Sequence, residues 1–242
     1  MNRYNYARRE AAPAVFEYVK KNYEALKGEL AELAKKQGRE SITLVAVTKS
    51  GSDEELLALA ACGAADIGEN RPQELVRRGA LLKDAGFAPR LHEIGNLQKN
   101  KVRQIIESVA LIHSLDSLSL AEEINKRAAA TLRRVPVLIE INSASEEAKG
   151  GIRPEDAEEF FLEVRKLPNL IVSGLMTMGP VSDNPEDMRP YFKLTKELFD
   201  SIKTKYGFEG GPILSMGMSD SYRIAIEEGA TLVRVGHKLF HK

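Results

Sequence analysis

The sequence has a single cysteine, Cys62, among its 242 residues. One cysteine forms no internal disulfide and supplies no thiolate zinc cluster. The four histidines, His92, His113, His237 and His241, are not expected to place two imidazoles on one helical face, as a helical metal site requires. We therefore expect no metal site.

The sequence also lacks net charge and long apolar runs. Lysine plus arginine and aspartate plus glutamate each total 35, so no broad positive field is available for nucleic acid or anionic membranes. No apolar run approaches the length of a membrane span, and the N-terminus lacks the apolar core of a signal peptide. We expect a cytoplasmic protein that binds neither nucleic acid nor membrane.

What the sequence does contain is a regular alternation of short apolar runs and charged stretches with helical periodicity. Parallel strands need crossover connections, and eight such units predict a closed (β/α)₈ TIM barrel. An open doubly wound sheet is the alternative, but its Gly-x-Gly-x-x-Gly turn is missing after the first strand. We predict strands at 42–49, 66–69, 90–94, 111–115, 135–142, 171–176, 213–216 and 232–235, with helices at 53–61, 72–83, 101–108, 119–132, 154–166, 185–206 and 220–228.

An extra N-terminal helix precedes the first predicted strand. Apolar residues recur at helical spacing from 4 to 37, and Gly38 is a stop signal. A chain of this length is typical of one α/β barrel. We predict a single domain at 1–242, with 1–38 as a leading helical segment.

Lys49 ends the most apolar of the predicted strands. Active sites in such barrels lie at the C-terminal ends of the strands. There the barrel interior is expected to desolvate the ammonium and favour the neutral amine that attacks a carbonyl. A lysine that extends into solvent is the alternative. The polar residues and glycines that follow the other strands favour the first interpretation.

The ends of the seventh and eighth strands have the features of a phosphate site. Gly217 permits close approach of the backbone, and Gly236 offers a bare amide. Ser219 has a hydroxyl and, with Asp220, is expected to begin a helix whose first amides face the mouth. Phosphate sites in this fold commonly use these two loops, although each residue alone is equally explained by a turn or a cap.

Arg234 alternates with two valines on the last strand, so its side chain is expected to point inward. A guanidinium can donate to a pyridine nitrogen without protonating it, which makes the ring a weaker electron sink than pairing with a carboxylate does. A salt bridge to Glu140 or Asp220 is the alternative. Further candidates to flank a bound ring, explained equally well by loop hydrogen bonds, are Glu69, Asn70 and Asn142.

Seven segments, in order over most of the chain, form a specific set: Val-Ala-Val-Thr-Lys at 45–49, Ile-Gly-Glu-Asn at 67–70, His-Glu-Ile-Gly-Asn-Leu-Gln-Lys-Asn-Lys at 92–101, Glu-Glu-Ala-Lys-Gly-Gly at 146–151, Gly-Leu-Met-Thr-Met at 174–178, Leu-Ser-Met-Gly-Met-Ser-Asp at 214–220 and Arg-Val-Gly at 234–236. Together they resemble the YggS/PROSC family of pyridoxal phosphate homeostasis proteins, itself similar to the barrel domain of bacterial alanine racemase. The third strand departs from the family pattern, with Leu91 and Glu93 on either side of His92 and with Asn96 after it.

The resemblance implies a fold-type III protein that carries pyridoxal 5′-phosphate (PLP) as a Schiff base, or imine, on Lys49. It also implies that the phosphate lies near Ser219 and Gly236, with Arg234 near the ring nitrogen. Members resemble carriers that act in vitamin B6 homeostasis without an established reaction, so no catalytic residue is assigned. We predict a cofactor site of Lys49, Asn70, Ser215, Ser219, Arg234 and Gly236.

A small PLP-dependent amino-acid racemase is the main alternative. Racemisation needs a second acid/base on the face of the substrate opposite the lysine. In alanine racemases, the resemblance implies, a tyrosine from an additional C-terminal domain of a partner subunit has this role, and we expect no such domain after Lys242. We therefore expect a carrier, a monomer or weak dimer, that passes PLP to apo PLP-dependent enzymes. A Schiff-base aldolase acting on a sugar phosphate is a third interpretation.

Overall fold

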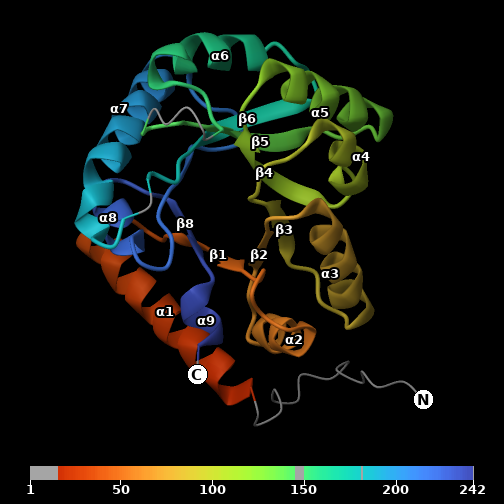
Figure 1. Cartoon of the computed structure of the whole chain (residues 1–242), viewed down its shortest axis with the longest axis vertical. Coiled ribbons are helices and arrows are strands. Elements are labelled where there is room, and N and C mark those ends of the chain that lie inside the picture. The colour runs from red at the N-terminus through yellow and green to blue at the C-terminus, as the bar shows by residue number, and fades with distance from the viewer. Residues whose placement is uncertain (1–15, 145–149, 181, 242) are drawn as a thin grey trace.

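The computed structural model describes residues 16–144, 150–180 and 182–241. In that part of the chain eight parallel strands follow one another in order and close into a barrel, because the last strand pairs with the first. Helices surround the ring of strands (Figure 1). The predicted (β/α)₈ barrel is therefore confirmed, and the open sheet is excluded. The strands are β1 (Thr43–Val47), β2 (Asp66–Glu69), β3 (Arg90–Glu93), β4 (Val109–Leu115), β5 (Val135–Glu140), β6 (Leu170–Met176), β7 (Ile213–Ser215) and β8 (Leu232–Val235).

Local sequence signals set where several helices begin. Ser52 and Glu55 form a capping box at the start of α2, in which each side chain accepts a hydrogen bond from the other residue's amide. Pro72 lies in the first turn of α3, where its missing N–H leaves no helical bond unmade. The α-helices are α1 (Glu17–Lys36), α2 (Asp53–Ala61), α3 (Pro72–Asp84), α4 (Val102–Ile105), α5 (Leu118–Ala130), α6 (Ala157–Val164), α7 (Arg189–Tyr206), α8 (Tyr222–Glu227) and α9 (His237–Phe240), and the 3₁₀ helices are η2 (Lys99–Lys101), η3 (Pro154–Asp156) and η4 (Pro185–Met188).

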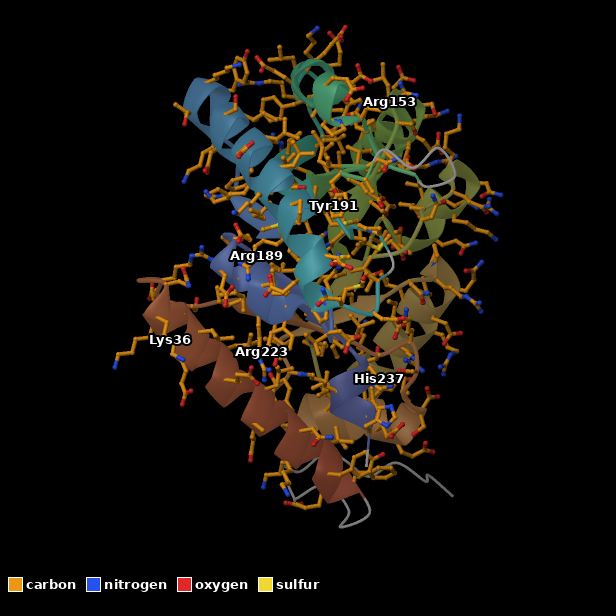
Figure 2. The ribbon with its side chains drawn as sticks, turned by 60° about the vertical axis from the view of Figure 1, so that its left-hand side comes forward. Lys36, Arg153, Arg189, Tyr191, Arg223 and His237 are labelled. Atoms are coloured by element: carbon orange, nitrogen blue, oxygen red, sulfur yellow. The ribbon has the colours of Figure 1, made fainter. Side chains whose placement is uncertain are left out.

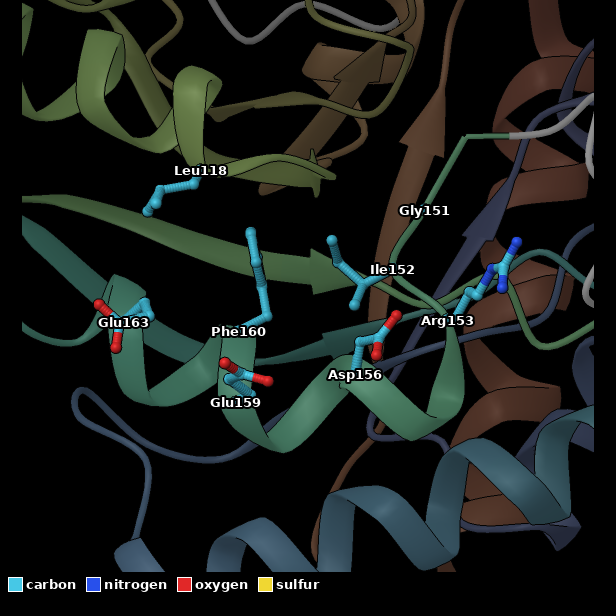
Figure 3. A pocket seen from close by; sticks show the side chains of 8 residues that line it. All are labelled: Leu118, Gly151, Ile152, Arg153, Asp156, Glu159, Phe160 and Glu163. Carbon is cyan, nitrogen blue, oxygen red and sulfur yellow. The ribbon is translucent and has the colours of Figure 1, made fainter.

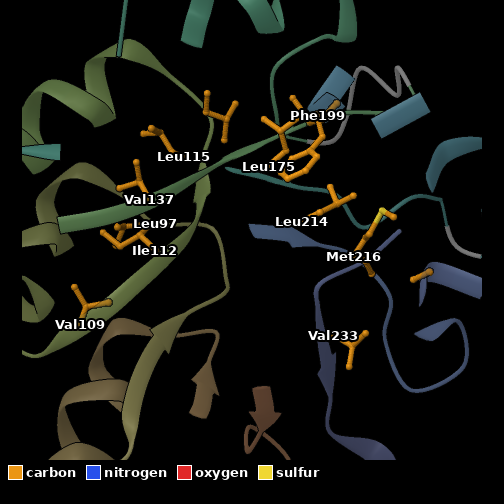
Figure 4. Packing of buried hydrophobic residues seen from close by; sticks show 14 of the residues in the cluster. Leu97, Val109, Ile112, Leu115, Val137, Leu175, Phe199, Leu214, Met216 and Val233 are labelled. Atoms are coloured by element: carbon orange, nitrogen blue, oxygen red, sulfur yellow. The ribbon is translucent and has the colours of Figure 1, made fainter. Parts of the chain in front are cut away.

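The main apolar core lies between the strands and the surrounding helices. Leu175 and Leu214, on neighbouring strands, belong to the same buried cluster as Phe199 of α7 (Figure 4). Val137 and Ile112 continue this cluster on the next strands around the ring. Burial on both faces of each strand is expected of a parallel barrel, and it explains why the strands are almost continuously apolar in sequence.

A smaller apolar cluster fills part of the ring interior, and polar side chains continue from it toward the mouth. Side chains two residues apart on a strand share a face. His113 and Arg234 each follow a member of this cluster by two residues, so both lie inside the ring. The cluster contains Val45, Leu111, Leu138, Met176 and Leu232.

The leading helix α1 packs on the outside of the barrel, along α2, α8 and α9 (Figures 1 and 2). Its apolar face is buried, and Leu30 is only 3% exposed. Asn22 donates to the carbonyl of His241 at 2.8 Å, and Glu29 pairs with Arg223 of α8. The N-terminal helix thus joins the last residues of the chain to the barrel. The part of the predicted helix before residue 16 lies outside the described residues, as does most of the 146–151 segment.

Several element boundaries differ from the predictions by a few residues. The first strand ends at Val47, and the predicted strand at 111–115 begins earlier, at Val109. The short helix α9 was not predicted, because four residues are too few to show a helical period. No helix in the described part of the chain is both long and apolar enough to cross a membrane.

Candidate functional site

A cavity of about 740 Å³ opens at the C-terminal ends of the barrel strands. The barrel gathers residues from distant parts of the sequence around this mouth. Ser215 is not among them, because it is fully buried at the end of β7. The other five predicted cofactor residues line the cavity together: Lys49, Asn70, Ser219, Arg234 and Gly236.

Lys49 lies in a turn two residues beyond β1. The Gly51 amide closes the turn by donating to the Thr48 carbonyl at 3.0 Å. The Lys49 side chain is exposed and faces the cavity. The expectation that the barrel interior desolvates this amine was wrong, because the strand ends at Val47 and the turn places Lys49 at the rim.

A buried ion pair holds the turn that carries Lys49. Arg78 of α3 lies 2.8 Å from Glu69, and their side chains are 8% and 2% exposed. Arg78 also donates to the carbonyls of Thr48 and Gly51, on either side of Lys49. The Thr48 hydroxyl donates to Glu69 as well. The backbone around the amine is thus anchored to α3.

This anchor was missed in the sequence, where Glu69 was interpreted as a neighbour of a bound ring. The Glu69 carboxylate instead contacts Arg78 and Thr48. A signal for Arg78 was present, because Leu75, Arg78 and Leu82 have the i, i+3, i+7 spacing of one helical face, and all three are buried. An arginine within such an apolar stripe is expected to have a buried partner.

Asn70 lies directly after β2 and lines the cavity, as does Asn142 after β5. Gly95, at the end of the next strand, allows the chain to pass close to Asn70. A Cβ atom at Gly95 would lie 2.3 Å from the Asn70 carbonyl oxygen. A side chain at position 95 would therefore displace Asn70 from the rim.

Ser219 and Gly236 bring the ends of β7 and β8 together. The Gly236 amide lies 3.4 Å from the Ser219 hydroxyl oxygen, and both residues are buried and line the cavity. A Cβ atom at Gly236 would lie 2.7 Å from the Val47 carbonyl oxygen, so only glycine fits without a shift of the backbone. The Ser219 hydroxyl can donate to an anion while its oxygen accepts from the Gly236 amide.

The expectation that Ser219 and Asp220 begin a helix was wrong. Helix α8 begins at Tyr222, because residues 218–221 form a turn. The Ser221 amide donates to the Met218 carbonyl at 3.0 Å, and the Met218 amide donates to the Ser221 hydroxyl at 3.2 Å. The turn leaves the Ser219 hydroxyl at the cavity rather than at a helix cap.

Arg234 points into the ring, as predicted, and is only 4% exposed. Its guanidinium donates to the Ser215 hydroxyl and, at 3.0 Å, to the Thr177 carbonyl. In the described part of the chain these bonds replace the salt bridge to Glu140 or Asp220 that was the alternative. Burial lowers the pKa of Arg234 to about 10, and nearby Glu140 acts in the opposite direction. The group therefore remains a cation at neutral pH.

A second cavity, of about 370 Å³, lies between the start of α5 and α6 (Figure 3). Its lining includes Asp156, Glu159 and Glu163, with Arg153 as its cation. Three carboxylates oppose the binding of an anionic ligand. A phosphorylated ligand is therefore expected at the barrel mouth rather than here.

His237 begins α9, and His241 directly follows that helix with its imidazole against that of His237. His237 and His241 have the i, i+4 spacing of a helical pair, and their Nε2 atoms are in contact. The spacing was visible in the sequence. No group of three or more potential metal ligands occurs among the described residues, so the pair lacks the further side chains of a protein metal site.

Comparison with known proteins identifies the family. Residues 22–241 match the family described as alanine racemase, N-terminal domain. A pyridoxal phosphate homeostasis protein from Aquifex aeolicus is 45% identical over 84% of this chain and 88% of its own length. The protein of that name from Schizosaccharomyces pombe is 33% identical over 83% of this chain and 84% of its own length. This chain belongs to the pyridoxal phosphate homeostasis family.

Solved structures agree with this family assignment. PipY from Synechococcus elongatus, in a structure with PLP bound, is 27% identical, with a TM-score of 0.80 over 92% of this chain and the whole of PipY. An unknown protein from Bifidobacterium adolescentis is 32% identical, with a TM-score of 0.86 over 98% of this chain and the whole of its own. Alanine racemase from Corynebacterium glutamicum shares the fold, with a TM-score of 0.73 at 18% identity over 93% of this chain and 61% of its own.

Two buried carboxyl groups on the barrel strands have perturbed acidities. Burial raises the pKa of Glu140, which lines the cavity, to about 7; Asp116 raises it further and Arg234 lowers it. Burial raises the pKa of Glu93 to about 8, the Gly95 amide acts against this, and Glu69 adds to it. The Glu93 carboxyl is therefore a weaker acid than an exposed glutamate.

Proposed function

We propose that the protein binds PLP in its barrel mouth and acts in PLP homeostasis, with the cofactor joined to Lys49 as a Schiff base. The observation that carries this proposal is one cavity lined by an amine, an anion cradle and a buried guanidinium. When bound, PLP supplies an aldehyde for the amine and an electron-withdrawing ring. We propose that Lys49 binds the aldehyde, that Ser219 and Gly236 bind the phosphate, and that Arg234 donates to the ring nitrogen.

The local chemistry of the mouth fits each part of this ligand. Gly236 cannot gain a Cβ atom without meeting Val47, which keeps a bare amide at the anion cradle. Arg234 has only N–H donors, so it can bond a ring nitrogen that is not protonated. Asn70, at the rim, is proposed to flank the ring. Ser215 is proposed to act on the cofactor indirectly, since its hydroxyl contacts Arg234.

Exposure of Lys49 favours a carrier over an enzyme that encloses its substrate. An amine at an open rim can be reached by water and by an acceptor protein. Arg234 weakens the ring as an electron sink, which opposes chemistry at the α-carbon of an amino acid. We therefore propose transfer of PLP to apo PLP-dependent enzymes by a cytoplasmic monomer or weak dimer.

A racemase would need a second acid/base across the substrate from Lys49. No tyrosine lines the cavity among the described residues, and the titratable groups there besides Lys49 and Arg234 are Glu140, Asp220 and His237. The tyrosine of the racemase mechanism therefore has no counterpart in this lining.

Transfer and turnover can be measured on the same preparation. We expect PLP-loaded protein to restore the activity of an apo-transaminase, and to exchange no Cα hydrogen of a panel of amino acids in deuterium oxide. Sustained exchange of the Cα hydrogen would contradict the carrier proposal and indicate an enzyme. Absence of PLP binding, with a Schiff base formed to a sugar phosphate instead, would indicate an aldolase.

A further inference from the structure

A continuous chain of hydrogen bonds crosses the barrel interior and ends at Arg234. Arg234 contacts the Ser215 hydroxyl, which lies 3.1 Å from His113 Nδ1. His113 Nε2 lies 3.0 Å from His92 Nδ1, and His92 Nε2 lies 2.8 Å from Asp66 Oδ1. The members come from β8, β7, β4, β3 and β2, and each is at most 5% exposed. We call this set the Arg234–Asp66 chain.

We infer one direction for these hydrogen bonds from the chemistry of the two ends. Arginine only donates, so the Ser215 oxygen accepts from Arg234 and its single hydrogen is left for His113 Nδ1. His113 then donates from Nε2 to His92, and His92 donates from Nε2 to Asp66. Burial raises the pKa of Asp66, but hydrogen bonds from His92 and Arg90 outweigh this effect and hold the pKa below its ordinary value, so this end is an acceptor.

This direction places the hydrogen of each imidazole on Nε2. Burial holds the pKa of His113 well below its ordinary value, and the charge of Arg234 acts in the same direction. A neutral His113 ring suits this fully buried position near the Arg234 cation. The hydrogen bonds from Ser215 to His113, from His113 to His92 and from His92 to Asp66 all run in the same direction. The Asp66 carboxylate therefore polarises each of these bonds, which makes the Ser215 oxygen a better acceptor for Arg234.

We propose that Ser215, His113, His92 and Asp66 are positioning residues that orient the Arg234 guanidinium toward a ligand in the mouth. The target is the ring nitrogen of PLP, so this inference rests on the proposed function. Arg234 has no carboxylate partner in the described part of the chain to orient it. The Ser215 oxygen and the Thr177 carbonyl hold it, and the chain keeps the Ser215 hydrogen turned away from the guanidinium.

The tautomers can be tested in the protein without PLP. Nitrogen-15 NMR of the histidine rings at neutral pH distinguishes Nδ1–H, Nε2–H and doubly protonated forms. We expect His113 and His92 both as neutral Nε2–H rings. A hydrogen on Nδ1 of His113 would reverse the bond to Ser215 and overturn the proposal, even if the protein binds PLP.

Variants of His113 test the effect on Arg234. His113→Leu removes the acceptor of the Ser215 hydrogen, and we expect about tenfold weaker PLP binding. His113→Asn returns an oxygen near the Nδ1 position, and we expect it to recover most of that loss. Ser173→Ala is the control, because Ser173 is a buried strand serine that is not part of the Arg234–Asp66 chain, and its hydroxyl donates to the Ile171 carbonyl. We expect this variant to bind PLP with wild-type affinity.

Titration of each apo-variant with PLP, together with its thermal unfolding, separates positioning from stability. Equal affinities of wild type and His113→Leu would overturn the proposal, as would failure of His113→Asn to improve on His113→Leu. If the leucine variant does not fold, Ser215→Ala removes the acceptor of Arg234 itself and is expected to weaken binding to a similar extent. If the wild type did not bind PLP, the proposed function would be wrong. The histidine tautomers would still test the Arg234–Asp66 chain in that case.

Discussion

At the scale of single residues, Glu93 is a buried acid whose ionisation opposes folding. Its pKa is raised from 4.5 to about 8 in the folded protein. The stability that this group contributes is complete below pH 4.5 and is lost as the pH rises toward 8, because only the unfolded chain ionises freely in that window. Glu93→Gln cannot ionise, and its amide oxygen can still accept from the Gly95 amide.

We therefore expect Glu93→Gln to be more stable than wild type at pH 8 by about 2–4 kcal/mol, and to differ little at pH 5. Denaturant unfolding at the two pH values measures the difference. Glu107→Gln, at an exposed site, is the control and should show no such pH dependence. A Glu93→Gln advantage that stays constant between pH 5 and pH 8 would contradict the buried acid.

At the scale of elements, the turn after β1 depends on α3 through Arg78. Arg78→Ala leaves the Glu69 carboxylate buried without a counter-ion and removes two hydrogen bonds to the turn. We expect the free energy of unfolding to fall by about 3–5 kcal/mol. Arg77→Ala is the matched control, because the Arg77 side chain is 47% exposed and its ion pairs with Asp53 and Glu74 lie at the surface. We expect this variant to lower the free energy of unfolding by at most about 1 kcal/mol.

Urea unfolding of both variants measures the two costs. Similar losses for Arg77→Ala and Arg78→Ala would show that the buried pair is no more important than a surface pair. In that case the turn that carries Lys49 would need another support.

Sequence patterns predicted the elements well where periodicity is long and poorly where tertiary contacts decide. The strands were predictable because burial on both faces makes them apolar. Lys49, Ser219 and Gly236 followed from their places after strands, and Arg234 followed from its place within the last strand. The exposure of Lys49 was not predictable, since it depends on where β1 stops. Chains of contacts such as Ser215 to His113 join residues far apart in sequence, and no local pattern reports them.

At the scale of the whole molecule, the closed ring and α1 connect distant parts of the described chain. Strands β1 and β8 pair, and α1 bonds to the residues after α9. Unfolding of β1 or β8 would open the ring, and detachment of α1 would expose its buried apolar face. We predict that the barrel and α1 unfold together as one domain.

Leu30→Ala in α1 tests this coupling. It should lower the free energy of unfolding by about 2–5 kcal/mol, because Leu30 is 3% exposed. Calorimetry should show one transition shifted as a whole, whereas the exposed control Glu32→Ala should change stability by at most about 0.5 kcal/mol. A separate early transition in Leu30→Ala would mean that α1 is an independent unit.

The most direct test of the account is to locate the lysine that binds PLP. Protein loaded with PLP should be yellow, and borohydride reduction followed by peptide mapping should place a pyridoxyl group on Lys49. Lys49→Ala should lose this label and remain folded, whereas Lys99→Ala, at an exposed site on η2, should keep it. A label on another lysine of the wild type, or a label that persists in Lys49→Ala, would contradict the account.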